Sequence, residues 1–194
     1  MSRKRVAILI SGRGSNMSAL IEAAKATDYP AEIVGVLSNR AAAQGLEIAA
    51  SHGIATASLA QSKFPSRDMF EDIMTQMLES WDVDIVCLAG FMRILGEDFV
   101  NRWEGKMINI HPSLLPLYKG LHTHERALAD GATVHGCTVH FVTPGLDEGA
   151  PILQAAVPVL PGDTPETLAA RILVEEHRIY PEALRLLAEG KVAA

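Results

Sequence analysis

The segment V-A-I-L-I-S-G-R-G-S-N, residues 6–16, decides the fold of this chain. Its first five residues are apolar and rich in β-branched side chains, as expected of a strand buried in a parallel sheet. A glycine turn follows, and Ser15 or Asn16 is placed to cap a helix that runs to about Thr27. A buried strand, a glycine turn and a helix, in that order, predict the first unit of an α/β protein.

The same alternation continues along the chain. We expect further strands at 32–37, 84–88 and 107–110, and further helices at 41–51, 66–80 and 96–103. Strands that alternate with helices in this way predict an open, mostly parallel, Rossmann-like sheet with helices on both faces.

The pattern changes after residue 111. A long loop over 111–122 and a helix near 123–130 precede two apolar runs, at 136–143 and 151–159. Seven residues separate these runs, too few for a crossover helix, so we expect a C-terminal antiparallel strand pair. A final helix is expected over 165–188. No linker or repeat interrupts the pattern, which predicts one domain over 1–194.

Composition limits the classes of function. The chain has 194 residues and a formal net charge of −6, which argues against general binding to nucleic acid or to anionic membranes. No run approaches the roughly 18 apolar residues that a membrane span requires. The two cysteines, Cys87 and Cys137, lie in apolar runs without metal-ligand spacing. We therefore expect reduced thiols and a cytoplasmic protein.

The segment M-I-N-I-H-P, residues 107–112, is the strongest candidate for a site. Asn109 and His111 alternate with isoleucines, so both polar side chains fall on one face of an extended strand that Pro112 ends. An amide can hydrogen-bond an oxyanion, and an imidazole can carry a proton near neutral pH. The pair therefore indicates acyl-group chemistry; the alternative is an ordinary polar rim at a strand end.

The glycine turn favours a small anionic ligand. The dinucleotide fingerprint requires a third glycine where Met17 stands, and no G-K-S or G-K-T of a Walker A motif occurs. We expect one phosphate to bind at Gly14, Ser15 and Asn16, where glycines and free helix N–H groups coincide. A tight turn without a ligand is the alternative, and Arg40 leaves a weaker case for NADP.

Seven histidines raise the question of a metal. His122 with His124, and His135 with His140, are the nearest pairs, but neither has the spacing of a known metal motif, so we expect no metal. His140 lies in V-H-F-V and is either an ordinary strand histidine or a contact to the site.

Asp147 stands in the loop T-P-G-L-D-E-G-A between the two late strands. The glycines of this loop let it fold tightly enough to reach the strand end at His111. A carboxylate beside His111 would favour the imidazolium and orient its ring. The alternative is an aspartate that only forms the turn.

Several motifs together resemble one family. They are S-G-R-G-S-N, L-A-G-F-M-R-I-L (88–95), I-N-I-H-P-S-L-L-P (108–116), G-L-H-T-H (120–124), H-G-C-T-V-H-F-V (135–142) and E-H-R-I-Y-P (176–181). The motif N-x-H-P-S-L-L-P marks the folate formyltransferases as a whole. The glycine turn with G-L-H-T-H is similar to the phosphoribosylglycinamide formyltransferases of purine biosynthesis.

The resemblance implies transfer of a formyl group from 10-formyltetrahydrofolate to 5-phosphoribosylglycinamide, without a metal, by a monomer or a homodimer. It divides the domain into a phosphate-binding half (about 1–105) and a folate and catalytic half (about 106–194). The implied catalytic residues are Asn109, His111 and Asp147. The implied phosphate and ribose residues are Gly14, Ser15, Asn16 and Glu176. The implied folate residues are Arg67, Met92, Arg93, Ile94, Leu95, Asn109, Thr143 and Asp147.

Other functions remain open at this point. A 10-formyltetrahydrofolate hydrolase would use water in place of the amine, and methionyl-tRNA and sugar-nucleotide formyltransferases share the central motif. From another class, an NADP-dependent oxidoreductase or a nucleotide-binding module would use the glycine turn. The chain departs from the resembled family at Leu173, which is apolar where members of that family can be polar.

Overall fold

A computed structural model describes residues 2–194, and within them one seven-stranded sheet forms in the order β3-β2-β1-β4-β5-β6-β7. The strands are β1 (Lys4–Ile10), β2 (Ala31–Ser38), β3 (Ala55–Ser58), β4 (Ile85–Leu88), β5 (Met107–His111), β6 (Val134–Phe141) and β7 (Pro151–Pro158). The first five strands are parallel, β6 runs antiparallel to β5, and β7 antiparallel to β6. The predicted mostly parallel sheet with an antiparallel C-terminal pair is confirmed.

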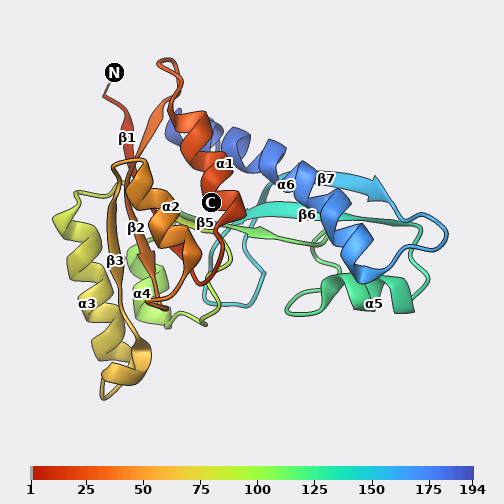
Figure 1. Ribbon diagram of the computed structural model, residues 1–194, viewed down its shortest axis with the longest axis horizontal. Helices are drawn as coiled ribbons and strands as arrows, with labels where there is room; N and C mark the ends of the chain where they lie inside the picture. The colour runs from red at the N-terminus through yellow and green to blue at the C-terminus, as the bar shows by residue number, and fades with distance from the viewer. Residues whose placement is uncertain (1) are drawn as a thin grey trace.

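Helices cover both faces of this sheet, as predicted (Figure 1). They are α1 (Ser15–Ala24), α2 (Gln44–Ser51), η1 (Gln61–Lys63, a 3-10 turn), α3 (Arg67–Ser80), α4 (Glu97–Arg102), α5 (Thr123–Ala129) and α6 (Pro165–Ala188). Because strand side chains alternate between faces, Val6, Ile8 and Ile10 pack with α1, α2 and α6. Ala7 and Leu9 point the other way and pack with α3 and α4. β1 is therefore buried on both sides.

The order of the strands creates a natural ligand site. From β1 the chain proceeds outward to β2 and β3, and it then returns to place β4 on the other side of β1. The loops after β1 and β4 therefore leave the sheet in opposite directions. In open α/β sheets, ligands bind in the crevice that forms between such loops, at the carboxyl ends of the strands.

The start of α1 differs from the sequence-based expectation. The helix begins at Ser15 with Gly14 as its N-cap, and no side chain caps it, so the predicted cap at Ser15 or Asn16 was wrong. Gly14 has φ 72°, a left-handed conformation that glycine adopts without strain. The Asn16 side chain instead donates to Glu176 on α6. The helix also ends at Ala24, before the expected Thr27. After Ala24 the backbone hydrogen bonds join residues three positions apart, as in a 3-10 helix.

The antiparallel strands bring distant polar residues together. In the β5–β6 register, Asn109 lies opposite His140 and His111 opposite Thr138. The loop from β6 to β7 then folds back sharply at Gly149. A side-chain Cβ at Gly149 would lie 1.7 Å from the carbonyl oxygen of Phe141, so only glycine fits there. This close approach fixes the loop that carries Asp147.

The long helix α6 fastens the C-terminal half to the sheet. Thr164 and Thr167 form a capping box at its start, and it runs across β6 and β7 (Figure 1). The buried hydroxyl of Tyr180 donates to the carbonyl oxygens of Leu88 and Ile108, at 2.8 and 3.2 Å. α6 thus holds the carboxyl end of β4 and the first part of β5, next to the candidate site. No helix in residues 2–194 is long and apolar enough to cross a membrane.

Candidate active site

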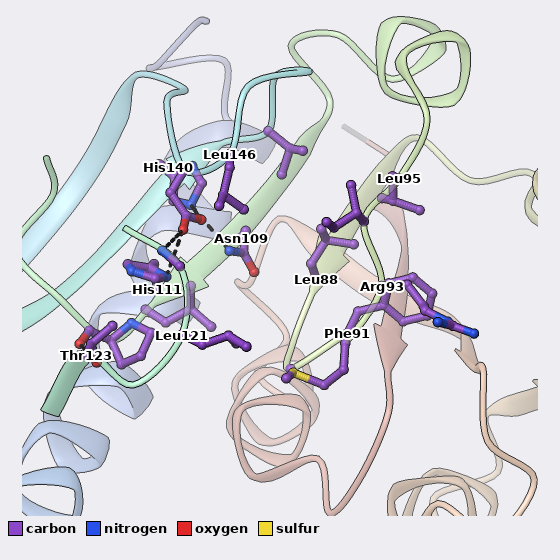
Figure 2. Close-up of a pocket in the computed structure, with 18 of the residues that line it drawn as sticks. Leu88, Phe91, Arg93, Leu95, Asn109, His111, Leu121, Thr123, His140 and Leu146 are labelled. Carbon is purple, nitrogen blue, oxygen red and sulfur yellow. Dashed lines mark hydrogen bonds and ion pairs between the residues drawn. The ribbon is translucent and has the colours of Figure 1, made fainter. Parts of the chain in front are cut away.

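A cleft of about 700 Å³ opens at the carboxyl ends of β4 and β5. Its walls come from four loop or strand-end segments (90–95, 109–112, 120–125 and 142–147), and Asn16 of α1 and Glu176 of α6 also line it. Figure 2 shows Asn109, His111 and His140 on one side and Phe91, Arg93 and Leu95 on the other. The cleft therefore has one polar wall with titratable groups and one wall of mainly apolar side chains. Both halves of the chain contribute to it.

One ring nitrogen of His111 is hydrogen-bonded, and the other lies near a carboxylate. Its Nε2 lies 2.9 Å from the carbonyl oxygen of Tyr118, and its Nδ1 lies 3.4 Å from Oδ2 of Asp147. The Tyr118 carbonyl only accepts, so Nε2 carries a hydrogen and Nδ1 faces the carboxylate. The expected approach of Asp147 to the strand end at His111 is therefore present in the fold.

The Asp147 side chain is held in place by a backbone donor of the facing loop. Its Oδ2 accepts a 2.8 Å hydrogen bond from the backbone N–H of Gly120, and its Oδ1 lies 3.7 Å from Nε2 of His140. The residue has φ 52°, and Tyr118 and His122, in the facing loop, also have positive φ. Such strained conformations in non-glycine residues persist where surrounding contacts fix them, and they cluster at functional sites.

His140 orients the Asn109 amide. Nδ1 of His140 lies 2.8 Å from the carbonyl oxygen of Phe141, which only accepts, so Nδ1 carries the hydrogen. Burial lowers the pKa of His140 and favours the neutral ring. Its Nε2 is then free to accept from Nδ2 of Asn109, at 3.3 Å. One amide hydrogen of Asn109 is thereby committed, and the second remains for a ligand.

The phosphate and ribose candidates meet at the start of α1. Nδ2 of Asn16 donates to Oε2 of Glu176 at 2.8 Å, and burial raises the pKa of the Glu176 carboxyl. Oδ1 of Asn16 is buried and has no hydrogen-bond partner among residues 2–194, so it can accept from a ligand hydroxyl. Gly14 and Ser15 do not line the cleft themselves, but they precede Asn16 at a helix start that no side chain caps.

The folate candidates are only partly brought together. Met92, Arg93, Ile94, Leu95 and Thr143 all line the cleft. Arg67 does not line it: its half-exposed guanidinium lies on α3, with Nε 3.8 Å from Oε1 of Glu71.

Several lining residues were not expected from the sequence. Leu121 and Leu146 are exposed apolar side chains on facing loops, and His122 and His124 also line the cleft. An exposed leucine in a loop gives no periodic signal, so only the folded arrangement reveals it. Leu173 does not line the cleft.

The two cysteines and His135 are buried away from solvent. Burial raises the pKa of both thiols, Cys87 and Cys137, to about 12, so neither supplies a thiolate at neutral pH. Burial also lowers the pKa of His135 to about 4, and its ring packs edge-on against His124. Residues 2–194 contain no group of three or more His, Cys, Asp or Glu side chains placed to hold a metal ion.

Comparison with known proteins decides the family. Residues 4–184 match the formyl transferase family model. The chain belongs to the formyl transferase family. The phosphoribosylglycinamide formyltransferase of Escherichia coli K12 is 46% identical over 187 residues, which cover 96% of this chain and 88% of that protein. The crystal structure of phosphoribosylglycinamide formyltransferase from Brucella melitensis superposes with a TM-score of 0.94, at 55% identity and full coverage of both chains.

Other relatives of this chain are much longer. The human trifunctional purine biosynthetic protein adenosine-3 is 51% identical over 190 residues, which cover 98% of this chain but 19% of that protein. Across the trifunctional relatives, this chain spans 14% to 19% of their length. The match to them is therefore a match to one part of a larger protein.

Proposed function

We propose that this protein transfers the formyl group of 10-formyltetrahydrofolate to the amine of 5-phosphoribosylglycinamide. The products are formylglycinamide ribonucleotide and tetrahydrofolate, in de novo purine biosynthesis. The observation that carries the proposal is the convergence of Asn109, His111 and Asp147 on one wall of the cleft that Asn16 and Glu176 also line. Membership of the formyl transferase family supports it.

The two substrates occupy different parts of the cleft. The phosphate binds at Gly14, Ser15 and Asn16, where helix N–H groups favour an anion. Glu176 accepts from a ribose hydroxyl. The folate lies along the 92–95 segment and the loop of Thr143 to Asp147, whose apolar side chains suit a flat ring system. Arg67, whose half-exposed guanidinium does not line the cleft, is proposed as a further folate contact because of the family resemblance.

The reaction is an attack of the ribonucleotide amine on the formyl carbon. A C–N bond forms, and the formyl oxygen becomes an oxyanion. The free N–H of Asn109 donates to this oxygen and the positive charge of His111 stabilises it; one such donor is typically worth about 3–4 kcal/mol. The tetrahedral intermediate collapses when its bond to the folate nitrogen breaks.

Asp147 governs the protons. Its carboxylate stabilises the imidazolium of His111 at 3.4 Å, and through a water molecule it accepts the proton of the attacking amine. The same proton passes to the departing folate nitrogen, so the site returns to its starting state. No covalent enzyme intermediate is required, and the two cysteines are buried. Much of the remaining acceleration comes from holding two substrates in register.

The setting of the reaction follows from the composition. A formal net charge of −6 disfavours nucleic acid and anionic membranes as partners, and two buried free cysteines are compatible with the cytoplasm, where we place the protein. All the named residues belong to one chain, so a monomer or a homodimer would supply a complete site.

One experiment tests the proposal against its rivals. The protein is mixed with 10-formyltetrahydrofolate, with and without 5-phosphoribosylglycinamide, and the deformylated folate is measured. We expect release only when the ribonucleotide is present. Release with water alone would indicate a hydrolase, and release only with methionyl-tRNA or an amino sugar nucleotide would indicate another formyltransferase. No release under any of these conditions would contradict the proposal.

A further inference from the structure

The 92–95 segment forms a wall of the cleft without being a helix or a strand. Met92 and Ile94 are exposed, at 55% and 78%, whereas Phe91 and Leu95 pack against the core under α3 and α4. Apolar packing is not directional, so it sets the depth of this segment but not the position of its backbone along the cleft. Something else must fix the two ends.

The first end is fixed by Ser11, the residue that follows β1. Its hydroxyl accepts a 2.8 Å hydrogen bond from the backbone N–H of Met92. The same hydroxyl donates to Oδ1 of Asn39 at 2.5 Å. Because a serine hydroxyl has one hydrogen, the bond to Asn39 leaves its lone pairs for Met92. Ser11 is 4% exposed, so water does not replace these bonds easily.

The second end is fixed by Glu71 on α3. Oε1 of Glu71 accepts a 2.7 Å hydrogen bond from the backbone N–H of Gly96, immediately after the segment. The carboxylate is 6% exposed, and a Cβ at Gly96 would lie 2.7 Å from its Oε2. The approach is thus as close as a glycine backbone allows. The guanidinium of Arg67, 3.8 Å from Oε1, lies on the same carboxylate.

We propose that Ser11 and Glu71 are positioning residues that hold the two ends of the 92–95 segment and so shape the folate wall. The inference rests on the proposed function, because it takes the ligand of this wall to be the folate. A wall held in its bound position loses less conformational freedom when the ligand binds. Neither residue lines the cleft, so neither contacts the ligand of this wall directly.

Three variants separate this role from a general loss of stability. Glu71→Ala removes the acceptor for Gly96, whereas Glu71→Gln keeps an oxygen acceptor and loses the charge. Asp72→Ala alters an exposed acid on the next position of α3 and is the control. Steady-state kinetics give kcat and KM for each substrate, and calorimetric titration gives the Kd of tetrahydrofolate. Thermal unfolding shows that each variant folds.

We expect Glu71→Ala to raise the folate KM and the tetrahydrofolate Kd about tenfold, as for a lost buried hydrogen bond. The KM for the ribonucleotide should change less than about twofold, Glu71→Gln should recover most of the loss, and Asp72→Ala should match the unmodified protein. Ser11→Ala should raise the tetrahydrofolate Kd in the same way, and it tests the proposal should Glu71→Ala not fold.

Several results would overturn the inference. They are an unchanged tetrahydrofolate Kd in folded Glu71→Ala and Ser11→Ala, an equal rise in both KM values, or a Glu71→Gln variant as impaired as Glu71→Ala. Failure of the proposed function would be visible earlier, because the unmodified protein would then neither bind tetrahydrofolate nor transfer the formyl group.

Discussion

Oδ2 of Asp147 lies 3.4 Å from Nδ1 of His111, and the two side chains are 9% and 8% exposed. The two residues are joined by no local element: His111 ends β5, and Asp147 belongs to the loop between β6 and β7. This separation is longer than an ordinary N–H···O hydrogen bond, so the contact is a close approach of a carboxylate to an imidazole ring. Its low exposure makes the charge of Asp147 effective, because solvent screens it little.

Replacing Asp147 by asparagine tests that charge. Asp147→Asn keeps an oxygen that accepts from Gly120 but removes the carboxylate beside His111. We expect kcat/KM for formyl transfer to fall by about 10²- to 10⁴-fold, the range for loss of a general acid–base group. The control is Glu148→Gln, whose exposed carboxylate pairs with Lys119. A kcat/KM within a few-fold of the unmodified value would show that the proposed role is wrong.

Asn109 is expected to act mainly in the transition state. Asn109→Ala removes the donor to the oxyanion, so kcat should fall by about 10²- to 10³-fold with little change in either KM. Steady-state kinetics with both substrates measure this, and Asn101→Ala on the exposed face of α4 is the control. A change confined to KM would mean that Asn109 binds the ground state instead.

Glu176 is expected to affect one substrate. Glu176→Gln replaces the buried carboxylate that accepts from Asn16, and we expect the ribonucleotide KM to rise about tenfold while the folate KM stays within about twofold. Glu175→Gln is the matched control, because its neighbouring carboxylate pairs with Arg178 outside the cleft. Equal effects on the two KM values would contradict a ribose contact.

Acid should weaken the fold through His135. Burial lowers its pKa to about 4 in the folded protein, below the ordinary value of 6.5, so the unfolded chain binds more protons between those pH values. The stability that comes from keeping His135 neutral in the folded state is therefore complete above pH 6.5, and it decreases as the pH falls toward 4. Urea unfolding across that range should show a smaller decrease for His135→Phe than for the unmodified protein.

The control for this prediction is His52→Gln, because His52 is exposed at the end of α2. It should leave the pH dependence as it is in the unmodified protein. Parallel curves for His135→Phe and the unmodified protein would exclude His135 as a source of the acid sensitivity.

Tyr180 is expected to stabilise the sheet at the floor of the site. Tyr180→Phe removes the buried hydroxyl that donates to the carbonyl oxygens of Leu88 and Ile108. The free energy of unfolding should fall by about 1–2 kcal/mol, because buried acceptors lose their donor. Urea unfolding measures it, and an unchanged m-value would show that the folded state stays equally compact. An unchanged midpoint would indicate that water replaces the hydroxyl.

Local sequence signals predicted most of the architecture. β1 and the final helix over 165–188 were expected close to where they lie, because buried β-branched runs and amphipathic spacing are strong local patterns. Some helix ends differed, α2 beginning at Gln44 and α1 ending at Ala24, and so did the start of α1, where Ser15 and Asn16 suggested a side-chain cap. A cap and a long-range partner compete for the same side chain, and Glu176, far along the chain, takes Asn16.

The sequence by itself determined the succession of strands and helices along the chain, the glycine turn, and the residue types at the end of β5. These features depend on residues within a few positions of one another, because the periodicity of apolar residues and the residue preferences of turns are local. Only the tertiary structure decided that His140 faces Asn109, that Tyr118 offers its carbonyl to His111, and that Ser11 and Glu71 hold the 92–95 segment. Those contacts depend on strand register and on helix packing between distant parts of the chain, which no local pattern specifies.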